Sequence, residues 1–336
     1  MSLVNVWFIL IAVLWTGFFV LEGFDFGVGI LHRHLARDEP DRMTIISTIG
    51  PLWDGNEVWL VVAGAAMFAA FPGWYATMFS ALYLALALVL VALILRGVAF
   101  EFRGRDESTR WRHTWSILLM IGSIVAPFLI GVALGDLLNG LPIGADQEYT
   151  GNFWDLLQPY ALWVGITLLS ICVLHGATFI ALKTTGEVRD RARRLARRAA
   201  PVTAVIVTVF AIWTHVVADK GVLLNLVEVA AILAVLGAVW LIGEGRDGWA
   251  FTVTTFVMAS TVVAIFTELF PRVMVSTNGA ATDLTISNTA SGSYSLKLMT
   301  VIFVVLFPVV AAYQAWSYHA FRRRLSRAEF EDPTEE

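Results

Sequence analysis

Four acidic residues in apolar stretches are the side chains of this sequence that could do chemistry. Glu22 and Asp25 are three positions apart in the first stretch, and the next stretch repeats this spacing with Asp54 and Glu57. Residues three apart on a helix face the same way, so each pair would point in one direction. Arg96, in the following apolar run, is the natural counter-ion. Because ionisable groups inside a membrane by default mark ion or proton pathways, a proton path is the first hypothesis.

The same acids have a simpler interpretation as helix caps. An acidic side chain at a helix N-terminus favours the helix dipole and satisfies free backbone N–H groups, so Asp54 could simply cap the helix that begins beside it. For one acid alone this interpretation stands. For the acids and Arg96 taken together, inside apolar flanks, the pathway is favoured.

The composition is typical of an integral membrane protein. Hydrophobic residues make up 58% of the 336 positions, charged residues make up 15%, and the mean hydropathy is +0.73. The net charge of -4 and the lack of a GxxxxGK[ST] loop argue against nucleic acid as a partner. The single cysteine, Cys172, can form neither an intrachain disulfide nor a CxxC metal site.

About nine stretches reach the roughly 20 apolar residues that a transmembrane helix needs, which predicts an all-α polytopic membrane protein. The expected spans are 4–28, 52–71, 75–99, 114–137, 155–181, 200–218, 221–242, 249–270 and 296–319. The sixth and seventh are separated only by Asp219, Lys220 and Gly221.

The basic residues predict how these spans cross the membrane, because Lys and Arg are retained on the cytoplasmic side. All but three of the 23 fall in cytoplasmic segments if the N-terminus is outside and the C-terminus is cytoplasmic. The exceptions are Lys220, Arg272 and Lys297. This orientation places one group of ionisable residues at a shared cytoplasmic depth: Glu22, Asp25, Asp54, Glu57, Arg96 and Glu101.

A weak internal repeat suggests how the spans are grouped. VLEGFDF at 20–26 resembles VLHGATF at 173–179. We therefore expect a first four-helix unit with the acid cluster and a second four-helix unit in the same orientation. An outer loop, a peripheral ninth helix and a cytoplasmic tail would follow. The expected boundaries are 1–140, 141–272 and 273–336.

The histidines do not predict a haem-ligand pair. Of the six, only His175 and His215 fall well inside expected spans. A haem held by two histidines needs them at one depth, whereas these two should be roughly 20 Å apart along the membrane normal, given the rise per residue of a helix. We interpret His175 as a hydrogen-bonded polar residue of the bundle, and we expect no metal site in the chain.

Seven motifs, in this order, resemble subunit II of the cytochrome bd-type quinol oxidases. They are GFDFGVG (23–29), PLWDGNEVW (51–59), LRGVAFEFR (95–103), TRWR (109–112), GDLLNGLP (135–142), YTGNF (149–153) and HGATF (175–179). The pair GFDxGVG and WDGNxVW is specific, and the motifs cover the first five expected spans.

The resemblance implies a terminal oxidase of the bacterial cytoplasmic membrane that oxidises quinol at its outer face and reduces O2 to water with cytoplasmic protons. Two haems b and one haem d would belong to subunit I, the partner in a heterodimer, with small accessory subunits and membrane lipid as further candidates. This chain would stabilise the assembly, contribute to proton access and hold no catalytic residue of its own. Whether it binds a quinone or lipid stays open.

Carried over by motif, Asp25 of GFDFGVG and Trp53 and Asp54 of WDGNEVW are the candidates for proton uptake, with Arg96 of LRGVAFEFR as the balancing charge. Glu57 is less secure, because members of the family carry Glu or Gln there. Secondary candidates are Glu22, Glu101 and His175.

Two other functions compete with this one. Intramembrane acids and a duplication are also features of a proton- or cation-coupled transporter. A purely structural partner, whose acids only cap helices, is the third hypothesis.

Overall fold

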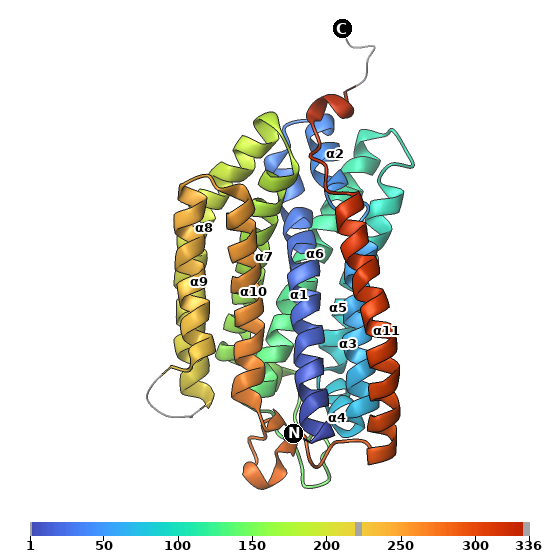
Figure 1. Ribbon diagram of the computed structural model, residues 1–336, viewed down its shortest axis with the longest axis vertical. Helices are drawn as coiled ribbons and strands as arrows, with labels where there is room; N and C mark the ends of the chain where they lie inside the picture. The colour runs from blue at the N-terminus through green and yellow to red at the C-terminus, as the bar shows by residue number, and fades with distance from the viewer. Residues whose placement is uncertain (1, 219–223, 332–336) are drawn as a thin grey trace.

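The computed structural model describes residues 2–218 and 224–331, which form a bundle of long helices with the two termini at opposite ends (Figure 1). Its α-helices are α1 (Leu3–Leu35), α2 (Glu39–Ser47), α3 (Trp53–Ala70), α4 (Pro72–Ala81), α5 (Tyr83–Phe102), α6 (Thr109–Asn139), α7 (Pro159–Lys183), α8 (Gly186–Ala218), α9 (Leu226–Gly243), α10 (Asp247–Leu269) and α11 (Ser293–Ala320). The shorter elements are η1 (Phe153–Leu156), η2 (Ala280–Thr282), η3 (Arg327–Glu329), β1 (Arg272–Met274) and β2 (Leu284–Thr285).

The predicted all-α polytopic class is confirmed. Within the described residues, 8 helices are long and apolar enough to cross a membrane, namely α1 and α5 to α11. Helix α3 corresponds to the expected span 52–71 and packs along α1. It is not among the 8, and Asp54, Asn56 and Glu57 occupy its first turns.

Two of the expected spans differ from the observed helices. The expected span 75–99 is divided at Leu82, where α4 ends and α5 begins. Helix α8 begins at Gly186 rather than near residue 200, because the arginine-rich segment buries an apolar stripe at every fourth position. The stripe consists of Val188, Ala192, Ala196 and Ala200. The predicted break at 219–221 lies outside the described residues.

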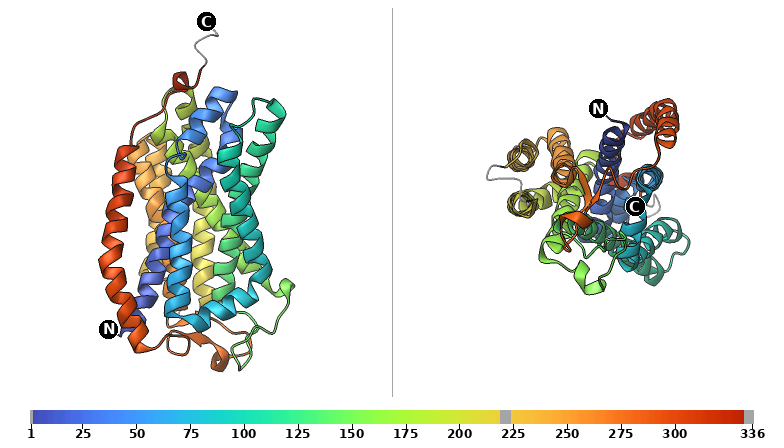
Figure 2. Two further views of the ribbon diagram at one scale, coloured as in Figure 1. Left: turned by 90° about the vertical axis from the view of Figure 1, so that its right-hand side faces the viewer. Right: turned by 90° about the horizontal axis from the view of Figure 1, so that it is seen from below.

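Helix α1 runs through the middle of the bundle and contacts α3, α6, α7 and α10 (Figure 2). Its approach to α7 is close enough to require glycine. A Cβ atom built on Gly27 would lie 2.0 Å from the carbonyl oxygen of Cys172, and one on Gly176 would lie 2.5 Å from Gly27 Cα. Small residues at such positions let membrane helices pack backbone to backbone.

Helices α7 to α10 contact one another on one side of α1, and α11 lies on the other side. Helix α11 is peripheral: Leu296 is its one buried residue, and many of its apolar side chains are exposed. It is fastened to α1 near the N-terminus, where Trp7 Nε1 donates a 3.0 Å hydrogen bond to Thr300 Oγ1. The division at 140 and 272 stays a prediction.

The two ends of the bundle are closed differently. At the C-terminal end, η3 is held to the region of α2 by the ion pair of Arg327 with Asp38 at 2.6 Å. At the N-terminal end, the segment expected as an outer loop forms the antiparallel pair β1 and β2 and packs back on the bundle. The amide of Leu141 donates to Val275 O at 3.0 Å there. The charge pattern assigns the first end to the cytoplasm.

Candidate functional site

Arg96 of α5 stands at the centre of a buried charge cluster. Its Nη1 forms an ion pair with Glu22 of α1 and a second, at 3.2 Å, with Oε2 of Glu57 of α3. The side chains of Arg96 and Glu22 are 0% exposed, whereas that of Glu57 is 23% exposed. Since buried charges are tolerated only when they are paired, this arginine ties three helices together. We call Glu22, Asp25, Glu57 and Arg96 the Arg96 cluster.

Aromatic rings and a close helix contact enclose the guanidinium group. Its central carbon lies 4.8 Å from the ring centre of Phe26 and 5.4 Å from that of Phe100, positions in which a ring face attracts a cation. Helix α6 closes the remaining side at Gly122, where a Cβ atom would lie 2.4 Å from Ala92 O. The arginine is thereby shielded from solvent and lipid.

Asp25 is connected to α3 and α11 through Asn56. The Asn56 side chain donates to Asp25 Oδ2 at 2.7 Å. Its own carbonyl oxygen accepts hydrogen bonds from Gln314 Nε2 and Tyr318 Oη, each at 2.8 Å. Asp25 is 0% exposed and lies within electrostatic range of Glu22 and Arg96. A continuous polar chain therefore runs from α11 to the Arg96 cluster.

Asn56, Gln314 and Tyr318, which form this chain of hydrogen bonds, were not among the residues predicted from the sequence. Asn56 lies inside the WDGNEVW motif, between the two acids that drew attention. Gln314 and Tyr318 are four positions apart in an otherwise apolar span, so they share a helix face. Polar side chains on one face of a membrane helix were the available signal, because such groups seek partners in neighbouring helices.

Asp54 and Trp53 lie at the edge of the site. Asp54 is exposed in the first turn of α3 and forms no hydrogen bond or ion pair with the described residues. The position that caps α3 is Leu52, without a side-chain hydrogen bond, so Asp54 does not cap the helix through its side chain. Trp53 is half-buried and stacks on Phe100 with ring centres 4.8 Å apart. Half-buried Glu57 lies one turn further in.

Glu101 is not part of the Arg96 cluster. It is exposed near the end of α5. The basic residue that follows it, Arg103, instead donates 2.6 and 2.7 Å hydrogen bonds to the carboxylate of Glu39. Burial lowers the pKa of Arg103, and its bond to Glu39 opposes that shift. This pair supports the α2 region and does not extend the site.

His175 lies buried in α7, apart from the acids. Its Nδ1 is 2.8 Å from Thr254 Oγ1, its Nε2 is 3.3 Å from Val20 O, and its ring stacks on Phe251 at 4.6 Å. Both ring nitrogens of His175 therefore lie within hydrogen-bond distance of a partner. His175 thereby joins α7 to α10 and α1. The other histidine inside an expected span, His215, lies with its Nδ1 beside Glu228 Oε2.

An apolar pocket of about 790 Å³ opens beside α3, α4, α5 and α6, toward the N-terminal end. Its lining includes Trp74, Tyr75, Met78, Leu134 and Phe266. A cavity of this size with few polar groups suits a hydrocarbon chain better than a charged ligand.

Comparisons with known proteins agree over almost the whole chain. The profile of the family described as cytochrome bd terminal oxidase subunit II matches residues 3–321. The cytochrome bd ubiquinol oxidase subunit 2 of Bacillus subtilis is 44% identical over 332 residues, 98% of each chain. The cytochrome bd-I ubiquinol oxidase subunit 2 of Escherichia coli K12 is 36% identical over 366 residues, 98% of this chain and 97% of that one. The solved bd oxidase of Geobacillus thermodenitrificans shares the fold, with a TM-score of 0.73 at 18% identity over 95% of this chain and 98% of that one.

Proposed function

Because the chain belongs to the cytochrome bd terminal oxidase subunit II family, we propose that its Arg96 cluster takes up cytoplasmic protons for the oxidase reaction. The chain is a subunit of a membrane quinol oxidase and a multi-pass bacterial membrane protein, and a transporter function is not favoured. The observation that carries the proposal is that two carboxyl groups, those of Glu22 and Glu57, pair with one buried guanidinium, and that a third, that of Asp25, is buried one helical turn from Glu22.

The surplus of carboxyl groups is what makes proton uptake chemically reasonable. Arg96 is permanently charged and balances one carboxylate. A second or third carboxylate in the same low-dielectric space is costly unless it carries a proton. The cluster can therefore hold a proton and release it when a neighbouring group becomes the better acceptor.

We propose that the path begins at exposed Asp54 and passes through half-buried Glu57 to Glu22 and Asp25. Asn56 would keep Asp25 oriented through its 2.7 Å hydrogen bond. Gln314 and Tyr318 in turn fix the amide of Asn56, which gives α11 a role in the site. Trp53 would close the lipid side by stacking on Phe100.

The oxidase requires haem and quinol, and we place two haems b and one haem d in the haem-bearing subunit I. Those haems would carry electrons from quinol to O2. In support of this assignment, both ring nitrogens of His175 already have partners in the bundle. We further propose that this chain stabilises subunit I in a heterodimer, that small accessory subunits and lipid can join it, and that a quinone or lipid tail occupies the apolar pocket.

The test is Asp25→Asn in the complete oxidase, with Glu101→Gln as a matched control at the same end of the bundle. We expect quinol-driven O2 consumption to fall by a factor of about ten or more, since lost proton transfer typically reduces rates by about 10² to 10⁴. Proton uptake in vesicles should fall in parallel, with haem content unchanged.

Asp54→Asn should slow turnover less than Asp25→Asn, because Asp54 is exposed and water can replace it. Wild-type rates in both variants would overturn the proposal. Loss of haem together with turnover would instead assign the acids to assembly, which is the structural alternative.

A further inference from the structure

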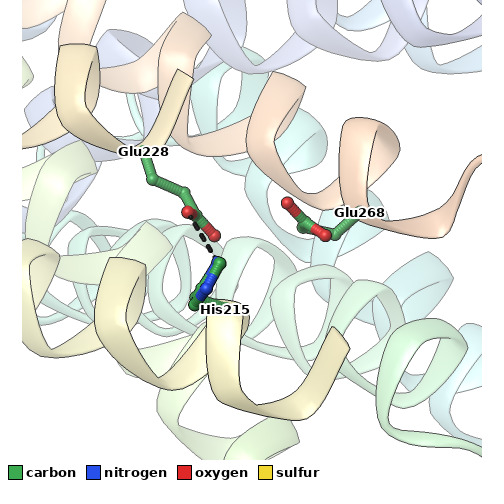
Figure 3. A group of neighbouring side chains, drawn as sticks. All are labelled: His215, Glu228 and Glu268. Carbon is green, nitrogen blue, oxygen red and sulfur yellow. Dashed lines mark ion pairs between the residues drawn. The ribbon is translucent and has the colours of Figure 1, made fainter. Parts of the chain in front are cut away.

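Three polar side chains meet at the N-terminal end of the bundle, far from the Arg96 cluster. They are His215 in the last turn of α8, Glu228 in the first turn of α9 and Glu268 near the end of α10. Figure 3 shows the imidazole and the two carboxylates turned toward one another. We call these residues the outer triad.

The triad is compact and buried. One ligand atom from each residue lies within 4.8 Å of the other two. His215 Nδ1 and Glu228 Oε2 are 3.1 Å apart. The exposed fractions are 7% for His215, 0% for Glu228 and 2% for Glu268. Three titratable groups taken out of water in this way require strong mutual compensation.

The local sequence holds the two glutamates in place. Asn225 begins α9 with a reciprocal capping box, in which its amide donates to Glu228 Oε2 at 2.8 Å. The Asn225 side chain also donates a hydrogen bond to Glu268 Oε1. The other Glu228 oxygen, Oε1, is buried and accepts no hydrogen bond from any residue that the structure describes. A lone pair of a fixed carboxylate is therefore available inside the triad.

We propose that the outer triad binds a divalent transition-metal ion of the Zn²⁺ type and joins the ends of α8, α9 and α10. Imidazole nitrogen and carboxylate oxygen are both zinc ligands, and three protein ligands leave a fourth position for water. Two carboxylates and a neutral imidazole also balance the two charges of the ion.

The geometry requires only small side-chain movements. Tetrahedral ligands about 2.0 Å from zinc are about 3.3 Å apart, close to the distance between His215 and Glu228. No metal site was expected from the sequence. These three residues come from three helices and follow no metal-binding spacing, so the sequence gives no signal for them. The inference is independent of the proton path, which lies at the opposite end of the bundle.

The test uses the complete oxidase, treated with a chelator and then titrated with Zn²⁺ alone. We expect the wild-type complex to bind one Zn²⁺ that Glu228→Gln and His215→Gln bind at least about tenfold more weakly, the smallest loss typical of a disturbed metal shell. His34→Gln, which changes an exposed histidine, should bind like the wild type.

Equal zinc binding by the wild type and both triad variants would overturn the proposal. The three side chains would then be a network of ion pairs without a metal. If a variant fails to assemble, as judged by haem absorbance, zinc-edge X-ray absorption of the wild-type complex decides. One imidazole and carboxylate oxygens at about 2.0 Å would support the site. A spectrum without imidazole, or no zinc retained, would overturn it.

Discussion

The Arg96 cluster and the outer triad both bury two or more carboxyl groups, but they differ in the cation that faces them. In the Arg96 cluster the cation is a guanidinium, covalently part of α5 and always charged. In the outer triad the third member is His215, whose imidazole can be neutral. The first arrangement has a fixed cation, whereas the second leaves room for an exchangeable one.

This difference teaches what each region can exchange. Because Arg96 cannot leave its position, the proposed proton uptake would change the number of protons on Glu22, Asp25 and Glu57. None of the three members of the outer triad carries a permanent positive charge, and in the proposed site the metal ion brings two. Substituting the residues that hold each region in place therefore tests whether the two regions differ in this way.

The largest effect is expected from Arg96→Ala. It would leave the buried carboxyl group of Glu22 without its ion-pair partner, and breaking a buried pair in this way costs about 3–5 kcal/mol. Equilibrium unfolding in mixed micelles, or the yield of assembled complex, measures the loss. Arg105→Ala is the control, because Arg105 is exposed and such changes stay within about 0.5 kcal/mol. Equal stability of the two variants would contradict a buried charge cluster.

Asn56→Ala should have the next largest effect. The change removes the amide that joins Asp25 to Gln314 and Tyr318, leaving buried polar groups without partners at a cost of about 1–3 kcal/mol. The same complex should also turn over more slowly, because Asp25 is no longer oriented. Ser260→Ala, which removes a hydroxyl bonded to its own helix, is the matched control. If the variant is as stable as the wild type, the hydrogen bonds from α11 to Asn56 do not stabilise the site.

The sequence predicted the acids and the arginine of one cluster but none of the other. Charged residues in apolar flanks are conspicuous, and their three-residue spacing fixes a common helix face. Spacing within one helix does not determine which residues of two packed helices face each other. The sequence therefore could not show that Glu57 rather than Asp54 contacts Arg96.

Helix ends explain the other differences between expectation and structure. Glu228 and Glu268 lie within a turn of helix ends, where acidic residues are common and draw no attention. The early start of α8 has the same origin: hydropathy detects the part of a helix in the membrane, not its polar extension. The break at Leu82 separates two apolar helices, so no change of composition marks it.

A smaller effect is expected at the other end from Asn225→Ala. Asn225 caps α9 and contacts both glutamates of the outer triad, and loss of an N-cap typically costs about 1 kcal/mol. Asn225→Ser should retain most of that stability, because serine also caps helices. We expect the alanine variant to bind Zn²⁺ more weakly as well. Unchanged stability in the mixed-micelle assay would show that the cap does not support the triad.

The smallest effect is expected from Tyr318→Phe, which removes one hydroxyl from the polar chain without leaving a group unpaired. The Asn56 oxygen keeps its 2.8 Å bond from Gln314, so the loss is one net hydrogen bond, about 0.5–1 kcal/mol. Phenylalanine retains the contact of the ring with Phe24. If turnover falls as far as in Asn56→Ala, the hydroxyl itself takes part in proton transfer. If only stability changes, Tyr318 positions Asn56, and the proton path stays with the carboxyl groups around Arg96.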